Sequence, residues 1–388
     1  MPVAEIVGGG IAGLTASIIL ARRGWSVRVH ERNAMLRASG NGLTIFENGL
    51  RVLEALQLVD DVCAHGQQLD KFVIRGNDGE KIVEYDPYQA TGGRIVMFQR
   101  QTLIDLLADA ATAAGVDIVL DSRVERAEAG GVLVLENGKR LAADLIVAAD
   151  GIHSSIRRSV AGDIPLTQYR KGAIRLLIPT GAKDFPDGNT RVATEYNHPN
   201  GRRVGLLPCS DEVMYMILVS LKVDKDAQKI PVDPALWRES FPTLEKFFER
   251  IGARGHYDPY YSVSPPAWHF GNCALVGDAA HGMTPALGQG ACSAMMTAFA
   301  LGSSKFETGS ISAALDRWEK GIRPLISFTQ NYAASMTEGK LDPKNEVFFS
   351  DPELRQVLMA DIPAMSQEAS PPPVGPVARE PLSGTRCQ

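Results

Sequence analysis

The chain has 388 residues, 45% of them apolar and 22% charged, a composition typical of a soluble globular protein and not of a disordered or fibrous one. The net charge of −5 gives no electrostatic basis for nucleic-acid binding. No apolar run approaches the roughly 18 residues that cross a bilayer. Because no secretory signal, C-x-x-C pair or H-E-x-x-H motif is visible, we expect a reduced cytoplasmic protein with no metal site.

The chain opens with a βαβ pattern, in which a short apolar strand at 3–7 precedes Gly8-Gly9-Gly10-Ile11-Ala12-Gly13 and a helical run to Arg23. In a G-x-G-x-x-G fingerprint the first glycine permits the tight turn and the second lets a pyrophosphate approach the backbone. The third lets the helix pack closely on the strand. Glu31 ends the second predicted strand, where a carboxylate can accept hydrogen bonds from a ribose. The opening therefore predicts a Rossmann-like dinucleotide-binding domain.

Periodicity and turn residues predict the remaining elements in chain order. Helices are expected over 48–62 and 102–115, and strands over 118–120, 131–135 and 141–149, with a hairpin turn at Asn137-Gly138. Four further strands are expected at 172–179, 191–197, 202–208 and 213–221, with a turn at Asn200-Gly201. A helix over 234–250, a buried strand at 273–276 and a long helix from about Gly290 follow. We therefore expect an antiparallel sheet inserted into an α/β protein.

Three later motifs specify the nucleotide. Asp150-Gly151 follows a buried strand, Gly277-Asp278 follows another and leads to Pro285 and Gly288-Gln289-Gly290, and Arg100-Gln101-Thr102-Leu103 opens a helix. With the fingerprint, these motifs resemble the FAD-dependent aromatic-ring monooxygenases of the para-hydroxybenzoate hydroxylase type, over roughly residues 3 to 330. The resemblance implies that Asp278 binds the ribityl chain, Arg100 contacts FAD and Asp150 lies near the pyrophosphate. His153 and His281 lie inside these motifs, where loop packing or solvent exposure is favoured over acid–base catalysis.

The resemblance implies O2 as a co-substrate and FAD bound non-covalently. Because the sequence has no second nucleotide-binding fingerprint, we expect NADH or NADPH to bind only transiently. The predicted FAD contacts are Gly8, Gly10, Ile11, Ala12, Gly13, Glu31, Arg32, Gly42, Leu43, Arg100, Asp150, Asp278, Pro285, Gly288, Gln289, Gly290 and Ala291.

Several stretches resemble one branch of this family, the 2-methyl-3-hydroxypyridine-5-carboxylate oxygenases, which oxygenate and open a pyridine ring. These stretches are 37–43, 48–54, 173–179, 208–209 and 256–260. The resemblance implies that Arg203 and Tyr215 hold the substrate, with Arg175, Tyr257 and Tyr260 as further candidates. We also expect the backbone from Pro285 to Gly290 to stabilise negative charge on the reduced flavin. A tyrosine of that branch is replaced near Asp70, and the acidic residue common after G-Q-G in the wider family is absent.

The expected clamp requires Arg203 and Tyr215 to lie on the same face of a hairpin. In a hairpin, the numbers of any two directly opposite residues add to the same constant. Two residues on different strands therefore share a face when the sum of their numbers is even or odd as that constant is. Arg203 and Tyr215 share a face only if the loop near Ser210 has an odd number of residues, such as 210–212. An arginine and a tyrosine on one face could clamp a carboxylate or a phenolate.

We therefore expect an FAD monooxygenase acting on a hydroxylated pyridine carboxylate, with or without ring opening. The alternatives are a simple hydroxylase of a phenolic acid or hydroxynicotinate, and a non-catalytic flavin sensor. We expect a mixed α/β fold: an FAD-binding domain at 1–170 and 271–330, an antiparallel-sheet substrate domain at 171–270 to which 66–99 could contribute, a helical segment at 331–365 and a mobile tail at 366–388. The partner is a small aromatic or heteroaromatic carboxylate, with no nucleic acid or membrane, and the protein is a monomer or homodimer.

Overall fold

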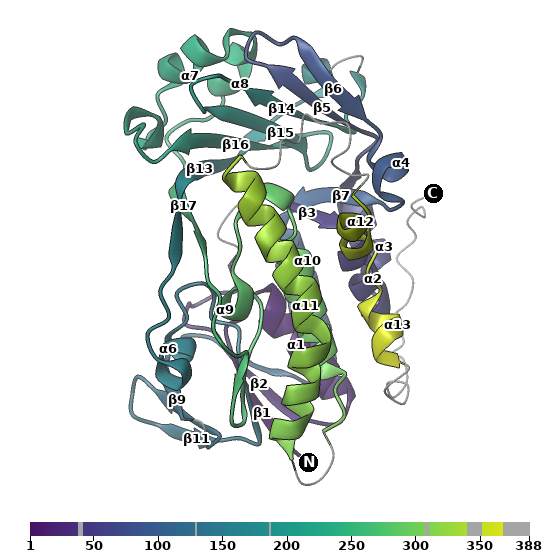
Figure 1. The fold of residues 1–388 in the computed structure, drawn as a ribbon, viewed down its shortest axis with the longest axis vertical. Coiled ribbons are helices and arrows are strands. Elements are labelled where there is room, and N and C mark those ends of the chain that lie inside the picture. Colours follow the sequence, from purple (N-terminus) through teal and green to yellow (C-terminus); the bar gives the residue numbers. More distant parts are fainter. Residues whose placement is uncertain (38–41, 129, 186–187, 307–309, 340–350, 368–388) are drawn as a thin grey trace.

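The computed structural model of the protein describes residues 1–37, 42–128, 130–185, 188–306, 310–339 and 351–367. A six-stranded sheet forms one end of the molecule (Figure 1), and its strands are parallel except for β18 at one edge. In spatial order these strands are β18 (His269–Phe270), β19 (Cys273–Leu275), β12 (Leu145–Ala148), β1 (Val3–Val7), β2 (Ser26–His30) and β8 (Asp117–Val119). The central strands β1 and β12 are almost wholly buried, as expected for a parallel sheet covered on both faces.

Helix α1 (Ile11–Arg22) packs on this sheet, and α10 (Gly290–Gly302) packs against α1. The contact is close, since a Cβ on Gly302 would lie 2.8 Å from Cβ of Ile19. Ten of the thirteen residues of α10 are buried, which fits a helix that is apolar around its whole circumference. The other helices of this part are α2 (Glu47–Ala55), α3 (Val59–His65), α5 (Arg100–Ala113), α6 (Ser155–Ala161), α9 (Asp278–His281) and α11 (Ile311–Thr337).

Two small antiparallel sheets join this part. One consists of β11 (Arg140–Ala142), β10 (Val132–Leu135) and β9 (Val124–Glu128), and Gly138 turns its first hairpin at φ 80°. The other consists of β3 (Gly42–Phe46), β7 (Ile95–Gln99) and β4 (Gln67–Gln68).

A seven-stranded sheet forms the opposite end of the molecule (Figure 1). In spatial order its strands are β17 (Tyr257–Ser262), β13 (Thr167–Pro179), β16 (Val213–Leu221), β15 (Arg203–Pro208), β14 (Val192–Asn197), β5 (Lys71–Gly76) and β6 (Lys81–Tyr85). The long strands β13 and β17 lead toward the first sheet. The α4 helix (Pro87–Thr91) follows β6, and short 3₁₀ turns lie at Ala182–Asp184, Asp226–Gln228, Pro242–Leu244 and Pro285–Leu287.

The two faces of the seven-stranded sheet have different surroundings. Even-numbered residues of β13, β15 and β16 form a second core beneath α7 (Pro234–Ser240) and α8 (Glu245–Phe248). Odd-numbered residues such as Tyr215, Leu207 and Leu177 pack against the core of the first part. We call this second surface the ring-facing face. It comprises Lys171, Ala173, Arg175 and Leu177 of β13, the odd-numbered residues 203–207 of β15 and 215–219 of β16, and the residues of β17, β14, β5 and β6 that continue these cross-strand rows.

Several sequence predictions were wrong in detail. The helix expected over 48–62 is two helices, α2 and α3, because Gln57 between them has φ of 64°. The helix expected over 234–250 is likewise broken around Pro242, and the strand expected over 141–149 is β11 followed by β12. The inserted sheet is not wholly antiparallel, since β5 pairs in parallel with β14. Segment 66–99 therefore supplies β5 and β6 to this sheet, while its β4 and β7 pair with β3.

Two helices close the described chain, α12 (Pro352–Leu358) and α13 (Ile362–Gln367), and both pack on α2. Helix α13 extends beyond the expected start of the tail at Ser366, and the rest of the expected mobile tail, 368–388, lies outside the described residues. Across the described ranges, none of the helices has the length and apolar character needed to span a bilayer.

Candidate active site

The glycine-rich turn after β1 has the geometry that its sequence predicts. Gly8 has φ of 106°, and a Cβ there would lie 2.4 Å from the carbonyl oxygen of Ala149. A Cβ on Gly13 would lie 2.0 Å from the oxygen of Gly8, so the helix can approach the strand only with glycine here. Gly10 is different, because its Cβ would meet nothing within 4 Å. The turn is thus closed at its two ends and open in the middle, where a phosphate would approach.

Glu31 lies at the rim of this turn. Its carboxylate accepts hydrogen bonds from the backbone N–H of Gly9 at 3.1 Å and of Asn33 at 2.9 Å. These contacts fix the carboxylate directly after β2, the position at which a ribose is bound in Rossmann folds. Arg32 beside it is exposed, whereas Ile11 and Ala12 are buried in the first turn of α1.

The second motif lies against the first. Gly277 has φ of 58°, and a Cβ there would lie 2.8 Å from Cβ of Ala12. Asp278 begins α9 immediately afterwards, and its side chain is exposed. Desolvation by the surrounding protein raises the pKa of this carboxyl, while the nearby positive charges of Arg100 and Arg175 lower it. Asp278 is therefore a carboxylate presented beside two cations, next to the glycine-rich turn.

Asp150 has a structural task that the sequence did not reveal. Its carboxylate accepts hydrogen bonds from the Ser154 hydroxyl at 2.5 Å and the Ile156 N–H at 3.2 Å, so it caps the start of α6. Arg157 of that helix donates to the carbonyl oxygen of Ala279 at 2.9 Å, which ties this turn to the Asp278 motif. A contact between Asp150 and FAD stays a prediction.

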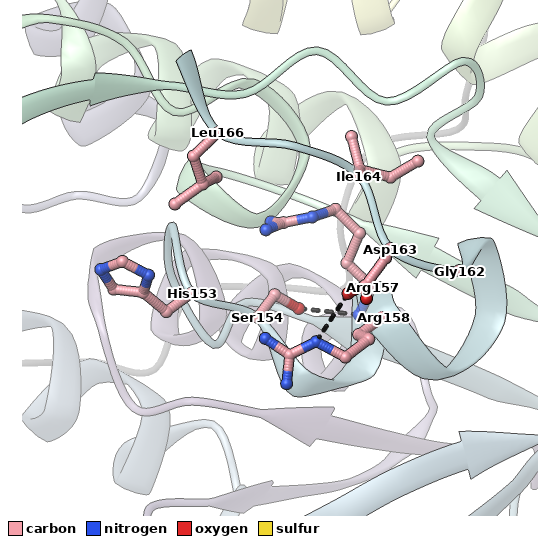
Figure 2. Close-up of a pocket in the computed structure, with 8 residues that line it drawn as sticks. All are labelled: His153, Ser154, Arg157, Arg158, Gly162, Asp163, Ile164 and Leu166. Carbon is pink, nitrogen blue, oxygen red and sulfur yellow. Dashed lines mark hydrogen bonds and ion pairs between the residues drawn. The ribbon is translucent and has the colours of Figure 1, made fainter. Parts of the chain in front are cut away.

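Figure 2 shows a small pocket beside this turn, lined by His153, Ser154, Arg157 and Arg158 and by residues 162–164 and 166. Its volume of about 50 Å³ is far below the several hundred Å³ of typical ligand sites. This pocket is therefore too small for an aromatic substrate.

The loop at 285–291 lies at the start of α10. Gly288 turns the chain at φ 70°, and a Cβ on Gly290 would meet nothing within 4 Å. Gln289 is fully buried, and its Oε1 accepts a hydrogen bond from Nδ2 of Asn48 at 2.8 Å. Its Nε2 is buried and has no hydrogen-bond partner among the described residues. The open start of a thirteen-residue helix and an unsatisfied amide donor fit a polar ligand that lies against this loop.

These features fit FAD. The open backbone at Gly10, the fixed carboxylate of Glu31, the neighbouring charges of Asp278 and Arg100, and the open N-terminus of α10 are suited to pyrophosphate, ribose, ribityl and ring contacts. Pro285 and Ala291 flank the loop at its two ends. Gly42 and Leu43 begin β3. A Cβ on Gly42 would lie 2.2 Å from the Tyr215 ring, so this glycine allows β3 to approach the ring-facing face.

Three rows of residues cross the ring-facing face. The row nearest β3 contains Leu177, Tyr215, Leu207, Ala193, Phe72 and Tyr85. The middle row contains Arg175, Ile217, Gly205, Glu195 and Ile74. The outer row contains Asp258, Ala173, Val219, Arg203 and Asn197.

Tyrosines and arginines dominate the electrostatics of these rows. Burial raises the pKa of Tyr215 to about 12, so its phenol stays protonated and can donate. Burial alone would lower the pKa of Arg175, but Tyr215, Tyr260 and Asp258 around it raise the pKa overall. Arg175 also interacts electrostatically with Asp278 and Arg100. Arg175 and Tyr215 are thus polar groups of this face that interact electrostatically with Arg100 of the flavin motifs.

Comparison with known proteins identifies the family. The model of the FAD binding domain family matches residues 1–306. The chain belongs to this family of flavin-dependent monooxygenases.

Individual relatives agree with this membership. A putative 2-heptyl-3-hydroxy-4(1H)-quinolone synthase from Rhodococcus erythropolis is 36% identical over 329 residues, 84% of this chain and 85% of that protein. A 3-amino-4-hydroxybenzoate 2-monooxygenase from Streptomyces cremeus is 30% identical over 75% of each chain. A solved structure of a 2-methyl-3-hydroxypyridine-5-carboxylic acid oxygenase variant has a TM-score of 0.88 at 34% identity and covers 94% of this chain and 98% of its own.

The expected mixed α/β fold and the use of FAD, NAD(P)H and O2 are confirmed for this flavin monooxygenase. The enzyme is an FAD-dependent aromatic-ring monooxygenase, which argues against a non-catalytic flavin sensor.

The predicted clamp has the expected face but a different arrangement. The register sum of 422 is even, and Ser210–Glu212 form the three-residue loop, so Arg203 and Tyr215 share the ring-facing face. They lie two rows, or about 13 Å, apart along the strands. Arg175, the weaker candidate from the sequence, lies between them in the middle row. The single clamp formed by Arg203 and Tyr215 is therefore replaced by a face with two separate arginines.

The predicted substrate contact Tyr257 falls outside this face. Tyr257 pairs with Ile174 and packs with the core beneath α7 and α8, on the opposite side of the sheet, so it does not share a surface with Arg203 and Tyr215. His281 is fully buried, and burial lowers its pKa to about 3, as expected for a packed neutral imidazole. His153 is exposed and lies edge-on to Tyr261.

Sequence reasoning missed Glu195, Asp258 and Asn48. The parity rule that placed Arg203 also applies to the Asn200-Gly201 hairpin and would have put Glu195 on the same face. Asp258 follows from the pairing of β17 with β13, for which the sequence carried no turn signal. Asn48 had no visible signal, because its partners lie more than 240 residues away in the chain.

Proposed function

We propose that this enzyme oxygenates a hydroxylated nitrogen heteroaromatic ring. In the balanced reaction, NAD(P)H, a proton, O2 and the ring give NAD(P)+, water and the ring with one added oxygen. The observation that carries the proposal is the position of Arg175 and Tyr215 on the ring-facing face, beside the FAD motif of Asp278 and Arg100. FAD, when bound, supplies electron transfer and oxygen activation.

The side chains on this face suit an electron-rich ring. Tyr215 stays protonated and can donate a hydrogen bond to a ring oxygen, which orients the substrate. The cationic Arg175 beside it favours the deprotonated form of a ring hydroxyl, the form that reacts most readily with an electrophilic oxygen. Backbone N–H groups at the start of α10 can stabilise negative charge on the neighbouring ring system. The proposed substrate contacts are therefore Arg175, Tyr215, Arg203 and Tyr260, with Pro285 beside the reacting ring.

Two kinds of ring are candidates. A hydroxylated pyridine carboxylate, oxygenated with or without ring opening, is supported by the similarity to the pyridine carboxylate oxygenase structure. A 4(1H)-quinolone is supported by the similarity to the quinolone synthase and by the aromatic stack of Phe72 and Tyr85 at the β5–β6 end of the face, with ring centroids 5.3 Å apart.

A substrate panel tests the proposal. Hydroxypyridines, quinolones and hydroxybenzoates, each with and without a carboxylate, are added to the holoenzyme with NADH or NADPH. We expect a heteroaromatic ring to stimulate NAD(P)H oxidation and O2 uptake, with little free peroxide. A product heavier by one oxygen indicates hydroxylation, and one heavier by oxygen plus the elements of water indicates ring opening. Stimulation by hydroxybenzoates alone would contradict the proposal.

A further inference from the structure

Arg203 already has a carboxylate partner within the protein. Its Nη1 lies 3.2 Å from Oε2 of Glu195, the diagonal neighbour on β14. The two side chains are 27% and 17% exposed, so the pair lies largely out of solvent. Burial alone would lower the pKa of Arg203, but Glu195 and a hydrogen bond with Tyr260 raise it overall. The guanidinium is therefore charged, and its charge is balanced before any ligand arrives.

The second arginine on this face is balanced as well. Arg175 Nη1 lies 3.2 Å from Oδ2 of Asp258. The remaining cation is Lys171 on β13, which lies near both Arg203 and Glu195 and whose pKa is lowered by burial and by Arg203. Ile217, Val219 and the small residues Ala173 and Gly205 separate these charged groups. On the ring-facing face, each arginine is thus paired with a carboxylate and Lys171 lies near the Arg203–Glu195 pair, with apolar surface between these groups.

We propose that Glu195 is a specificity-determining residue that makes the ring site favour an uncharged heteroaromatic ring over the same ring with a carboxylate. The inference rests on the proposed function and specifies its substrate class. A substrate carboxylate that reached Arg203 would lie beside Glu195, and two like charges in a largely buried site repel strongly. A neutral ring can still accept hydrogen bonds from Arg203 and Tyr260 without displacing Glu195.

Two ligands that differ only in one carboxylate test this selectivity. The dissociation constants of 3-hydroxypyridine and 3-hydroxypyridine-5-carboxylate are measured on the holoenzyme from the change that each causes in the flavin spectrum. For the wild type we expect the neutral ring to bind at least as tightly as the carboxylate. In Glu195→Gln the preference should shift toward the carboxylate by about 10-fold or more, because Arg203 loses its internal partner.

Two further variants separate this effect from a general change of charge. Glu84→Gln alters the net charge equally, but Glu84 lies on β6 on the opposite face of the same sheet, bound to Lys71 and Lys81. It should keep the wild-type preference. The double variant Glu195→Gln/Arg203→Ala should lose the carboxylate gain of Glu195→Gln, because that gain depends on Arg203.

The outcomes are distinct. A wild type that binds the carboxylate at least 10-fold more tightly than the neutral ring would overturn the inference, and this result needs no variant to fold. An unchanged preference in Glu195→Gln that retains FAD would also overturn it. Both results leave the proposed function intact. The proposed function would be contradicted, and the inference with it, if neither of the two hydroxypyridines and no 4(1H)-quinolone stimulated NAD(P)H oxidation.

Discussion

Asn48 on α2 donates a hydrogen bond of 2.8 Å to Oε1 of Gln289, in the loop that faces the expected flavin ring. The same amide nitrogen donates to the carbonyl oxygen of Val357 on α12 at 3.0 Å. Both side chains are fully buried. One asparagine therefore links the flavin-side loop, the helix after β3 and a helix near the end of the described chain.

Replacing this asparagine should loosen the loop. Asn48→Ala would leave the buried Gln289 amide without its donor, and a buried unsatisfied polar group costs about 1–3 kcal/mol. We expect the free energy of unfolding of the holoenzyme to fall by that amount and FAD to dissociate faster. Urea unfolding and flavin fluorescence measure the two effects. The control Asn137→Ala changes an exposed turn, and an equal loss in both variants would contradict the prediction.

The Asp278 carboxylate should hold FAD. Loss of charge-assisted contacts in Asp278→Ala should raise the FAD dissociation constant by roughly 10- to 150-fold while the fold persists. Titration of the apoprotein with FAD and far-UV circular dichroism measure these effects, and Asp163→Ala, at an exposed carboxylate, is the control. In the wild type, acid precipitation should release FAD into the supernatant. FMN, or flavin that stays in the pellet, would contradict non-covalent FAD.

Buried His281 should make stability depend on pH. Its folded pKa of about 3 lies below the ordinary value near 6.5, so the unfolded chain binds the extra proton between these values. This contribution is fully present above about pH 6.5 and is lost as pH falls, by at most about 1.4 kcal/mol per pH unit. His281→Gln, which cannot be protonated, should lose less stability between pH 7 and 5.5 than the wild type. His65→Gln on the surface should behave like the wild type, and parallel curves for all three would refute the assignment.

The C-terminal helices should be required, whereas the segment after them should be dispensable. The sequence predicts that the tail begins at Ser366, but α13 spans Ile362–Gln367, so a truncation that spares this helix has to follow Gln367. A chain that ends there should keep FAD binding and activity, because 368–388 are rich in proline and poor in large apolar groups. A chain that ends before Asp351 should lose both, since it lacks buried Leu354 and Leu358 and the Val357 acceptor. Flavin content and NAD(P)H oxidation compare the two truncations.

The sequence alone determined the features that depend on neighbouring residues. The spacing of Gly8, Gly10 and Gly13 predicted the turn between β1 and α1, and the structure shows Gly13 packed against the Gly8 carbonyl oxygen within that unit. The strands of the β14–β15–β16 meander and the shared face of Arg203 and Tyr215 followed from a period of two and from turn residues. These are local rules of backbone geometry, so a single sequence contains them.

Only the tertiary structure decided which of these groups meet. The parallel pairing of β5 with β14, the partners Glu195 for Arg203 and Asp258 for Arg175, and the placement of Tyr257 on the opposite side of the sheet all depend on strands that are distant in the chain. The bridge from Asn48 to Gln289 and Val357 joins segments more than 240 residues apart. Such contacts depend on how whole elements pack and are not encoded in a local pattern. For this reason the sequence predicted the cofactor site more fully than the ring site, where the charge on each arginine is balanced by a residue from another strand.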